Sequence, residues 1–387
     1  MALDAGPPGP LELLVVQPTP FCNINCSYCY LADRQSTRQI SAQTLEQTFA
    51  WVFASGLVRA PFTLLWHAGE PLVVPREFYR TAVALLERYN RPPVAIHHAL
   101  QTNATLIDED WCRLFLEHDI HPGVSVDGPA FLHDRHRRTR QGQGTLDRVL
   151  RGIRLLREHG VPFYVITVLT AEALLYPDEL FDFYQEQQIP TVAFNVEEIE
   201  GPHTTSSLLG VEMRERFRRF FGRFMDLALA ADPPLAVREF HTSACALRGP
   251  RYGPGSRAQE NKPWAIVNVD CEGNFSTYSP ELLGISSPRH GSFALGNVAH
   301  DSLDSVIALE RFQRLEDEIR LGVERCRQTC PYFAFCGGGA PANKFFETGT
   351  FAATETLFCR LHKQVCLDVT LARLEQPFAA PAGPTRP

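Results

Sequence analysis

The sequence predicts an α/β protein in which six strand-helix units form an incomplete barrel, followed by a smaller cysteine-rich domain. Three observations lead to this prediction. Short apolar runs alternate with amphipathic stretches through the first two-thirds of the chain. That alternation stops after Val196. Most of the 11 cysteines lie in two groups, one near the start of the chain and one near its end.

Six apolar runs are the predicted strands of the barrel. They cover residues 11–16, 62–66, 95–101, 123–126, 163–169 and 191–196. Between them, apolar residues recur at helical spacing, as in 145–160, where Leu146, Val149 and Ile153 would share one face. Gly160 then ends that helix. Six such units predict a partial (β/α)6 TIM-type barrel, whose active-site groups lie on loops at the carboxyl ends of the strands.

The boundary between the two predicted domains lies near residue 235. A helix rich in Arg and Phe is expected over 211–230, and Pro233 and Pro234 break the chain after it. The barrel would therefore span 1–235 and the cysteine-rich domain 236–375. Residues 376–387 are rich in Pro and Ala without apolar periodicity, so this tail is predicted to be disordered.

The composition restricts the choice of partners. A net charge of −7 and a pI near 6.0 argue against a nucleic-acid partner. The local basic cluster is expected to be solvated surface or an anion-binding group within an enzyme; it comprises Arg135, Arg137, Arg138 and Arg140. We read no export signal and no apolar run long enough to span a membrane, so we expect a cytoplasmic protein without a membrane partner. In a reducing cytoplasm, grouped cysteines favour metal binding over disulfides.

The first cysteine group follows the first predicted strand, with Cys22, Cys26 and Cys29 on one loop. Thiolates are the ligands of iron-sulfur clusters, and three of them leave one iron of a four-iron cube open. S-adenosylmethionine (SAM) can chelate that iron through its amine and carboxylate. Reduction then yields a 5'-deoxyadenosyl radical. The alternatives are a loop of reduced cysteines or half of a zinc site, but zinc fingers pair C-x2-C units.

This spacing, with Tyr28 directly before the last cysteine, resembles the signature of the radical SAM superfamily. Segments at the next three strand ends resemble further motifs of that family: HAGEPL at 67–72, TNA at 102–104 and SVDGP at 125–129, followed by His133, Asp134 and Arg137. The resemblance implies a [4Fe-4S] cluster on the three cysteines and a SAM site formed by Tyr28, Ala68, Gly69, Glu70, Asn103, Ser125, Asp127 and Arg137. Ala68 departs from the family, which has glycine there. Each motif alone is weak, but their order at consecutive strand ends is specific.

The second cysteine group consists of Cys326, Cys330, Cys336 and the more distant Cys359. It resembles a cluster-binding set of SPASM (twitch-like) domains, with one extra residue in the first gap. The resemblance implies one auxiliary [4Fe-4S] cluster that is fully ligated and suited to electron transfer. A structural zinc site is the alternative.

A first auxiliary cluster, which standard SPASM domains also carry, is expected to be missing. Tyr278 and Ala340 stand where two of its cysteine ligands would be. Cys245, Cys271 and Cys366 could contribute to an unusual further site, and this question stays open. Cys112 is expected in the core because it falls in an amphipathic helix.

Segments 194–201, 279–284 and 336–344 resemble the cyclophane-forming maturases of glycine-rich-repeat peptides, the GrrM/OscB type. This resemblance implies a C–C crosslink between an aromatic ring of a ribosomally synthesised precursor peptide and the β-carbon of a residue two positions later, after hydrogen abstraction by the 5'-deoxyadenosyl radical. Restoring the ring requires a general base. Glu281 is our candidate, and Glu197 and Glu198 are further ones. Glu281 could equally cap a turn or pair with an arginine.

The implied partners are the precursor peptide and an external electron donor of the flavodoxin or ferredoxin type. Two alternatives remain. One is a related maturase with another product, such as formylglycine, a thioether or an epimerised residue. The other is a non-catalytic metal-binding protein in which both cysteine groups are structural.

Overall fold

The computed structural model describes residues 8–249 and 257–375. The predicted disordered tail at 376–387 lies outside the described residues. The six predicted strands are confirmed as neighbouring parallel strands in the predicted order. They are β1 (Leu13–Val16), β3 (Phe62–Trp66), β4 (Ile96–Thr102), β5 (Ile120–Ser125), β7 (Tyr164–Leu169) and β8 (Thr191–Val196). Strand β5 begins earlier than predicted and contains Pro122.

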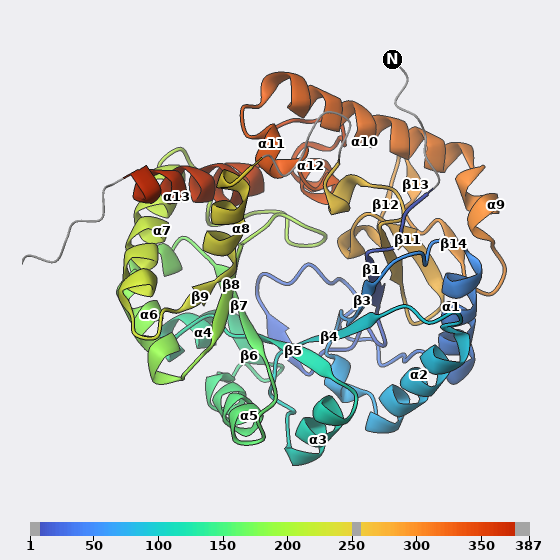
Figure 1. Cartoon of the computed structure of the whole chain (residues 1–387), viewed down its shortest axis with the longest axis horizontal. Helices are drawn as coiled ribbons and strands as arrows, with labels where there is room; N and C mark the ends of the chain where they lie inside the picture. The colour runs from blue at the N-terminus through green and yellow to red at the C-terminus, as the bar shows by residue number, and fades with distance from the viewer. Residues whose placement is uncertain (1–7, 250–256, 376–387) are drawn as a thin grey trace, which may run out of the picture.

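Helices cover the outer side of this curved sheet (Figure 1). They are α1 (Ala42–Ala54), α2 (Arg76–Tyr89), α3 (Glu109–Glu117), α4 (Ala130–His136), α5 (Leu146–Glu158), α6 (Pro177–Glu186) and α7 (Met213–Ala230). The predicted face of α5 is buried. The Ser41 side chain caps α1 by accepting from the Thr44 backbone N–H, and Asp108 caps α3 in the same way. Cys112 is buried in the core, as predicted.

The sheet continues beyond the six strands at both edges. On one side β10 (Ile266–Val269) pairs parallel with β1, followed by the antiparallel β11 (Asn274–Thr277) and β14 (Gly296–Asn297). On the other side β9 (Ala236–Val237) pairs parallel with β8. Within the described residues, β14 and β9 end the ten-stranded sheet without pairing to each other, so the barrel is open. The domain boundary at 235 stays a prediction.

The C-terminal part closes over the open side of the arc in Figure 1. Its helices are α8 (Arg238–Leu247), α9 (Leu303–Ile307), α10 (Glu310–Thr329), α11 (Phe333–Cys336), α12 (Pro341–Thr348) and α13 (Cys366–Glu375). A π-helical stretch, Cys359–Val365, leads into α13. Two short antiparallel strand pairs complete the structure: β12 (Ser286–Ser287) with β13 (Gly291–Ser292), and β2 (Ile24–Cys26) with β6 (Arg137–Thr139). No helix of the described residues has the length and apolarity to cross a bilayer.

Candidate active site

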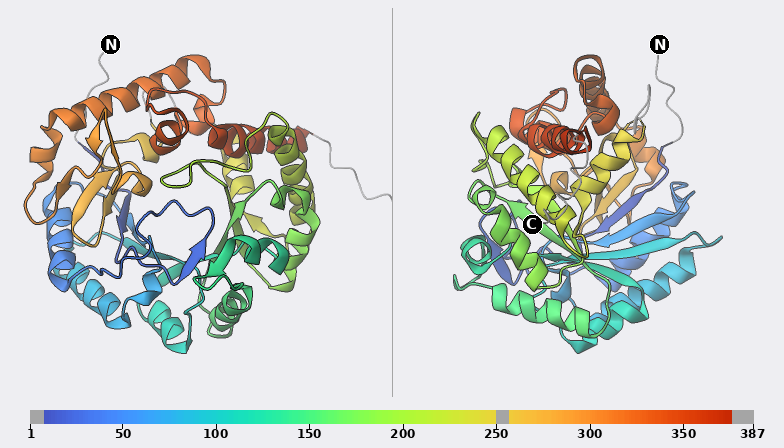
Figure 2. Two further views of the ribbon diagram at one scale, coloured as in Figure 1. Left: turned by 180° about the vertical axis from the view of Figure 1, so that it is seen from behind. Right: turned by 60° about the vertical axis from the view of Figure 1, so that its left-hand side comes forward.

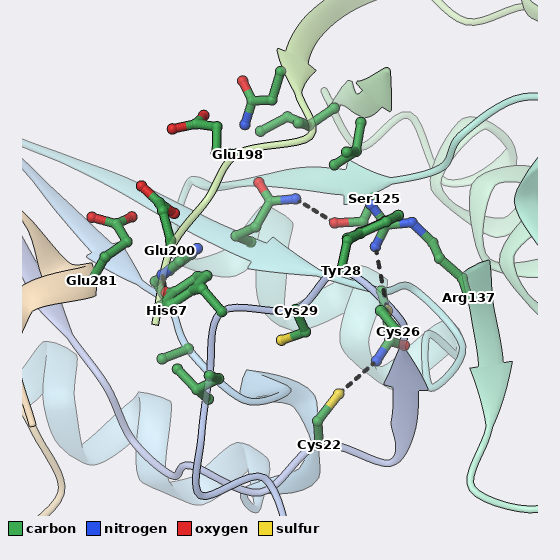
Figure 3. A pocket seen from close by; sticks show the side chains of 18 of the residues that line it. Cys22, Cys26, Tyr28, Cys29, His67, Ser125, Arg137, Glu198, Glu200 and Glu281 are labelled. Carbon is green, nitrogen blue, oxygen red and sulfur yellow. Dashed lines mark hydrogen bonds between the residues drawn. The ribbon is translucent and has the colours of Figure 1, made fainter. Parts of the chain in front are cut away.

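The loop that carries the first cysteine group lies inside the arc of the sheet, as both the front and rear views show (Figures 1 and 2). Cys22, Cys26 and Cys29 line one cavity of about 370 Å³ (Figure 3). Side chains from the carboxyl ends of successive strands complete its wall: His67, Gln101, Ser125, Val168 and Asn195. The loop and the strand ends therefore meet where the barrel topology predicts an active site.

Arginines fix the cysteine loop from several directions. Arg34 Nη1 donates to the Cys26 carbonyl at 2.9 Å, and Arg140 Nε donates to the Cys22 carbonyl at 2.9 Å. Arg137 Nη1 lies 3.9 Å from Cys26 Sγ, because β2 pairs Cys26 with Arg137 on β6. Of the basic cluster, Arg137 is buried, whereas Arg135 is exposed and pairs with Glu172.

The chemistry of the three thiols fits an iron-sulfur cluster. Burial raises the pKa of Cys22 to about 12 and that of Cys26 to about 11, so thiolates at these positions require a strongly cationic partner. Three thiolates facing one cavity could bind three irons of a cube and leave the fourth accessible to SAM.

The HAGEPL segment turns through two left-handed residues, Ala68 at φ +69° and Gly69 at φ +57°. Both line the cavity. A Cβ on Gly69 would lie 2.5 Å from the carbonyl oxygens of Thr19 and Phe21, so this position requires glycine. Ala68 keeps the same turn with a side chain, at a cost of roughly 1 kcal/mol. The backbone here faces the space where SAM is expected.

Glu70 does not line the cavity. Its buried carboxylate accepts from Thr102 Oγ1 at 2.7 Å, from the Asn103 N–H at 2.8 Å and from the Leu72 N–H at 3.0 Å. Burial raises the pKa of Glu70 to about 7 despite these bonds. The carboxylate therefore ties the end of β3 to the end of β4 and orients the backbone of the turn.

Asp127 is held in a buried ion pair. Arg137 Nε lies 2.9 Å from Asp127 Oδ2, the Val168 N–H donates to Oδ1 at 3.0 Å, and the Tyr28 hydroxyl donates to the same carboxylate. Burial would raise the pKa of Asp127, but Arg137 outweighs it and the pKa is lowered. Tyr28 and Arg137 line the cavity, whereas Asp127 supports them from behind.

Asn103 and Ser125, for which the sequence predicts SAM binding, both line the cavity. Asn103 Nδ2 donates to Asn23 Oδ1 at 2.8 Å and lies 3.7 Å from Cys22 Sγ. Ser125 Oγ accepts from Gln101 Nε2 at 2.8 Å.

Three carboxylates separate this cavity from a second one of about 400 Å³. Glu198, Glu200 and Glu281 line both cavities, and Figure 3 shows them on the side away from the cysteines. Asn343 Nδ2 donates to Glu198, and Ser279 Oγ donates to Glu281. The Glu198 and Glu200 carboxyls are hydrogen-bonded to each other. Burial raises the pKa of Glu198 to about 7 and also raises the pKa values of Glu200 and Glu281.

The predicted base Glu281 thus lies beside two further carboxyls. Sequence reasoning missed Glu200, although it follows Glu198 at the same strand end. Glu197 also lines the first cavity, but its carboxylate is bonded by the Ser207 N–H at 2.7 Å and lies 3.2 Å from His203 Nε2. We name the Glu198, Glu200 and Glu281 set the carboxyl triad.

The second cysteine group lines a small third cavity: Cys326 on α10, Cys330, Cys336 on α11 and Cys359. Lys344 and Lys363 also line it. Ala340, Phe358 and Lys363 line the second cavity as well. Each cavity therefore shares lining residues with the next, from the cysteine loop to these four thiols. Across residues 8–249 and 257–375, no three His, Cys, Asp or Glu side chains are grouped as ligands of one ion.

Tyr278 and Ala340, which replace expected cysteines, both line the second cavity. The Tyr278 hydroxyl donates to Glu316. Of the other cysteines, Cys245 is exposed, Cys271 is half-buried and Cys366 is buried.

Comparisons with known proteins match the segment that carries the first cysteine group. The profile of the Radical SAM superfamily matches residues 16–185. The uncharacterized protein sll1766 of Synechocystis sp. is 44% identical over 374 residues, which cover 95% of this chain and 93% of that protein. The serine-type anaerobic sulfatase-maturating enzyme of Bacteroides thetaiotaomicron is 25% identical over 88% of this chain and 84% of its own.

Solved structures share the fold over almost the whole chain. The anSMEcpe structure with bound AdoMet and Kp18Cys peptide superposes with a TM-score of 0.77 at 20% identity, covering 95% of this chain and 98% of that one. SuiB of Streptococcus suis bound to its precursor peptide SuiA gives a TM-score of 0.62 at 18% identity, covering 92% and 76%. With the matched profile beginning at the first strand and including all three cysteines of the loop, this chain is an enzyme that belongs to the radical SAM superfamily.

Proposed function

We propose that this enzyme oxidises a side chain of a peptide substrate by removing one hydrogen atom, one electron and one proton. The observation that carries the proposal is the series of three cavities, with three thiols at one end, the carboxyl triad in the middle and four thiols at the other end. When bound to Cys22, Cys26 and Cys29, a [4Fe-4S] cluster with SAM would supply the 5'-deoxyadenosyl radical that takes the hydrogen atom.

SAM would be held by groups of the first cavity. Asn103, Ser125, Tyr28 and Arg137 line it together with the backbone of Ala68 and Gly69. Glu70 and Asp127 would act indirectly, by fixing the turn at 68–69 and the Tyr28 and Arg137 side chains. The anSMEcpe structures with bound AdoMet support a SAM site in this fold.

The carboxyl triad would take the proton. A carboxyl group with a raised pKa is a stronger base than an exposed one once it is ionised, and the pKa of Glu198 near 7 suits proton uptake at neutral pH. We assign the base to Glu281, with Glu198 and Glu200 sharing its proton. The set of Cys326, Cys330, Cys336 and Cys359 would hold one auxiliary [4Fe-4S] cluster that takes the electron.

Two products of the peptide oxidation are considered, a cyclophane and formylglycine. The late sequence motifs favour a cyclophane, whereas the named relatives are sulfatase-maturating enzymes and favour formylglycine. The relatives are the stronger support, so formylglycine is the better supported of the two products. Both products need a base and an electron acceptor, so the geometry described above suits either one. SuiB bound to its precursor supports a peptide substrate. We further propose that an external protein of the flavodoxin or ferredoxin type donates electrons to the enzyme, and that the enzyme is cytoplasmic.

The experiment uses anaerobically purified enzyme with SAM, a chemical reductant and two peptides. One peptide carries an aromatic residue two positions before an aliphatic one, and the other carries Ser or Cys without aromatic residues. Formation of 5'-deoxyadenosine and loss of two hydrogens from the first peptide, with no reaction toward hydroxylamine, supports the crosslink. An aldehyde on the second peptide that hydroxylamine traps supports formylglycine. Absence of 5'-deoxyadenosine with either peptide contradicts the proposed function.

A further inference from the structure

Lys344 is a buried lysine next to the four C-terminal cysteines. Its side chain is only 3% exposed, and its Nζ lies 3.5 Å from Cys326 Sγ. Lysine is almost never fully buried unless its charge is compensated. In the part of the chain that the structure describes, Lys344 forms no ion pair with an aspartate or glutamate, and its Nζ instead contacts a thiol. The site is therefore built to hold negative charge on sulfur.

The neighbouring helix leaves room for this ammonium group. A Cβ at Gly322 on α10 would lie 3.1 Å from Lys344 Nζ and would overlap the Phe351 carbonyl oxygen. Any residue other than glycine would thus push the ammonium away from Cys326 or move the chain at Phe351. Gly322 permits the close approach of Lys344 to the cysteines.

We propose that Lys344 raises the reduction potential of the four-cysteine site. This inference rests on the part of the proposed function that places a cluster on Cys326, Cys330, Cys336 and Cys359. Reduction adds one negative charge to a site that already carries four thiolates. A cation 3.5 Å from one sulfur, in surroundings of low dielectric constant, stabilises the reduced form more than the oxidised form. Its N–H group pointing at sulfur acts in the same direction.

With this role, Lys344 would help the four-cysteine site to accept the electron that the oxidation releases. The 5'-deoxyadenosyl radical would take one hydrogen atom from the substrate and become 5'-deoxyadenosine. The substrate radical would then give one electron to a cluster held by the four cysteines and one proton to the carboxyl triad. An external carrier of the flavodoxin or ferredoxin type then takes the electron. Lys344 favours the first transfer by stabilising the added charge.

Lys363 is the matched control, because it lines the same cavity with the same charge. It is only half-buried and lies over the Phe358 ring, with its Nζ 5.4 Å from the ring centre. Water screens its charge more strongly than that of Lys344. Removing the Lys363 charge should therefore shift the potential less.

The test is a potentiometric titration of the full chain in which Cys22, Cys26 and Cys29 are all replaced by Ala, so that the four-cysteine site alone can hold iron. Lys344→Met and Lys363→Met are compared in this background. We expect about four irons per chain and a clearly lower midpoint potential for Lys344→Met, with a smaller decrease for Lys363→Met. Lys344→Gln, which keeps a donor without the charge, should lie between Lys344→Met and the parent.

Equal shifts for Lys344→Met and Lys363→Met, or none, would overturn the role of Lys344. Absence of iron from the background protein, in which only Cys22, Cys26 and Cys29 are replaced, would also overturn this role, because the four-cysteine site would hold no cluster. If Lys344→Met fails to fold, Lys344→Gln decides the question. Peptide oxidation is measured separately in the enzyme with all three N-terminal cysteines, so failure of the proposed function is distinguished from failure of this inference.

Discussion

Asn343 and Lys344 are consecutive residues of α12, yet their side chains reach two different sites. Asn343 Nδ2 donates to the Glu198 carboxylate, whereas Lys344 Nζ lies 3.5 Å from Cys326 Sγ. One turn of helix therefore contacts both the carboxyl triad and the four-cysteine group. Pro341 at the first position of α12 and Gly349 at its end fix the length of this helix. In our proposal, these two sites accept the proton and the electron of the same oxidation.

Replacing Cys22, Cys26 and Cys29 together with Ala should abolish SAM cleavage. Iron content should fall from about eight to about four per chain, because the four C-terminal thiols remain. Anaerobic iron analysis and chromatography of 5'-deoxyadenosine measure both quantities. Surviving SAM cleavage would end the assignment of these ligands, and about twelve irons in the parent would contradict the two-cluster count.

Glu281→Gln should separate SAM cleavage from product formation. The amide keeps the size of the side chain but cannot accept a proton, so we expect product to fall roughly 100-fold or more while 5'-deoxyadenosine still forms. Glu260→Gln is a suitable control, since Glu260 lines the second cavity outside the carboxyl triad. Equal losses in the two variants would show that any carboxylate here affects the reaction.

The rate of product formation should rise with pH through about 7 and then level off. A carboxyl group of the triad must be ionised to accept a proton. Burial raises the pKa of Glu198 to about 7 and also raises the pKa of Glu281, so a falling pH removes the active form. In the Asn343→Leu variant, the rise of the rate with pH should move to higher pH, because the Asn343 hydrogen bond lowers the pKa of Glu198. The pH profile of 5'-deoxyadenosine formation without peptide serves as the control. A shift to lower pH in Asn343→Leu would contradict this account.

The sequence was sufficient to predict the barrel strands because each one is a short apolar run before a helical repeat. The runs at 62–66 and 191–196 match β3 and β8 residue for residue. The sequence could not predict that β10 extends the sheet beside β1, since strand pairing between distant segments depends on tertiary contacts. The segment 266–269 therefore looked like part of a separate domain.

The sequence identifies candidate site residues by their type and spacing. It says less about where their side chains point. The cysteines of each group line one cavity, and their role as cluster ligands stays a prediction. Glu70 belongs to the expected motif, but its side chain turns to the end of β4, where Thr102 and Asn103 donate to it, and the Leu72 N–H donates as well. Lys344 gave no signal, because only the packing of α12 against α10 buries it beside Cys326.

The turn at 68–69 predicts opposite effects for two small substitutions. Ala68→Gly should raise the free energy of unfolding by up to about 1 kcal/mol, because glycine adopts the positive φ of +69° without strain, although it also gains freedom in the unfolded chain. Gly69→Ala should lower it by at least about 2 kcal/mol, because the new Cβ would meet the Thr19 and Phe21 carbonyl oxygens. Denaturant titration under anaerobic conditions measures both changes. If Gly69→Ala proved as stable as the parent and still bound SAM, this turn would be looser than its contacts indicate.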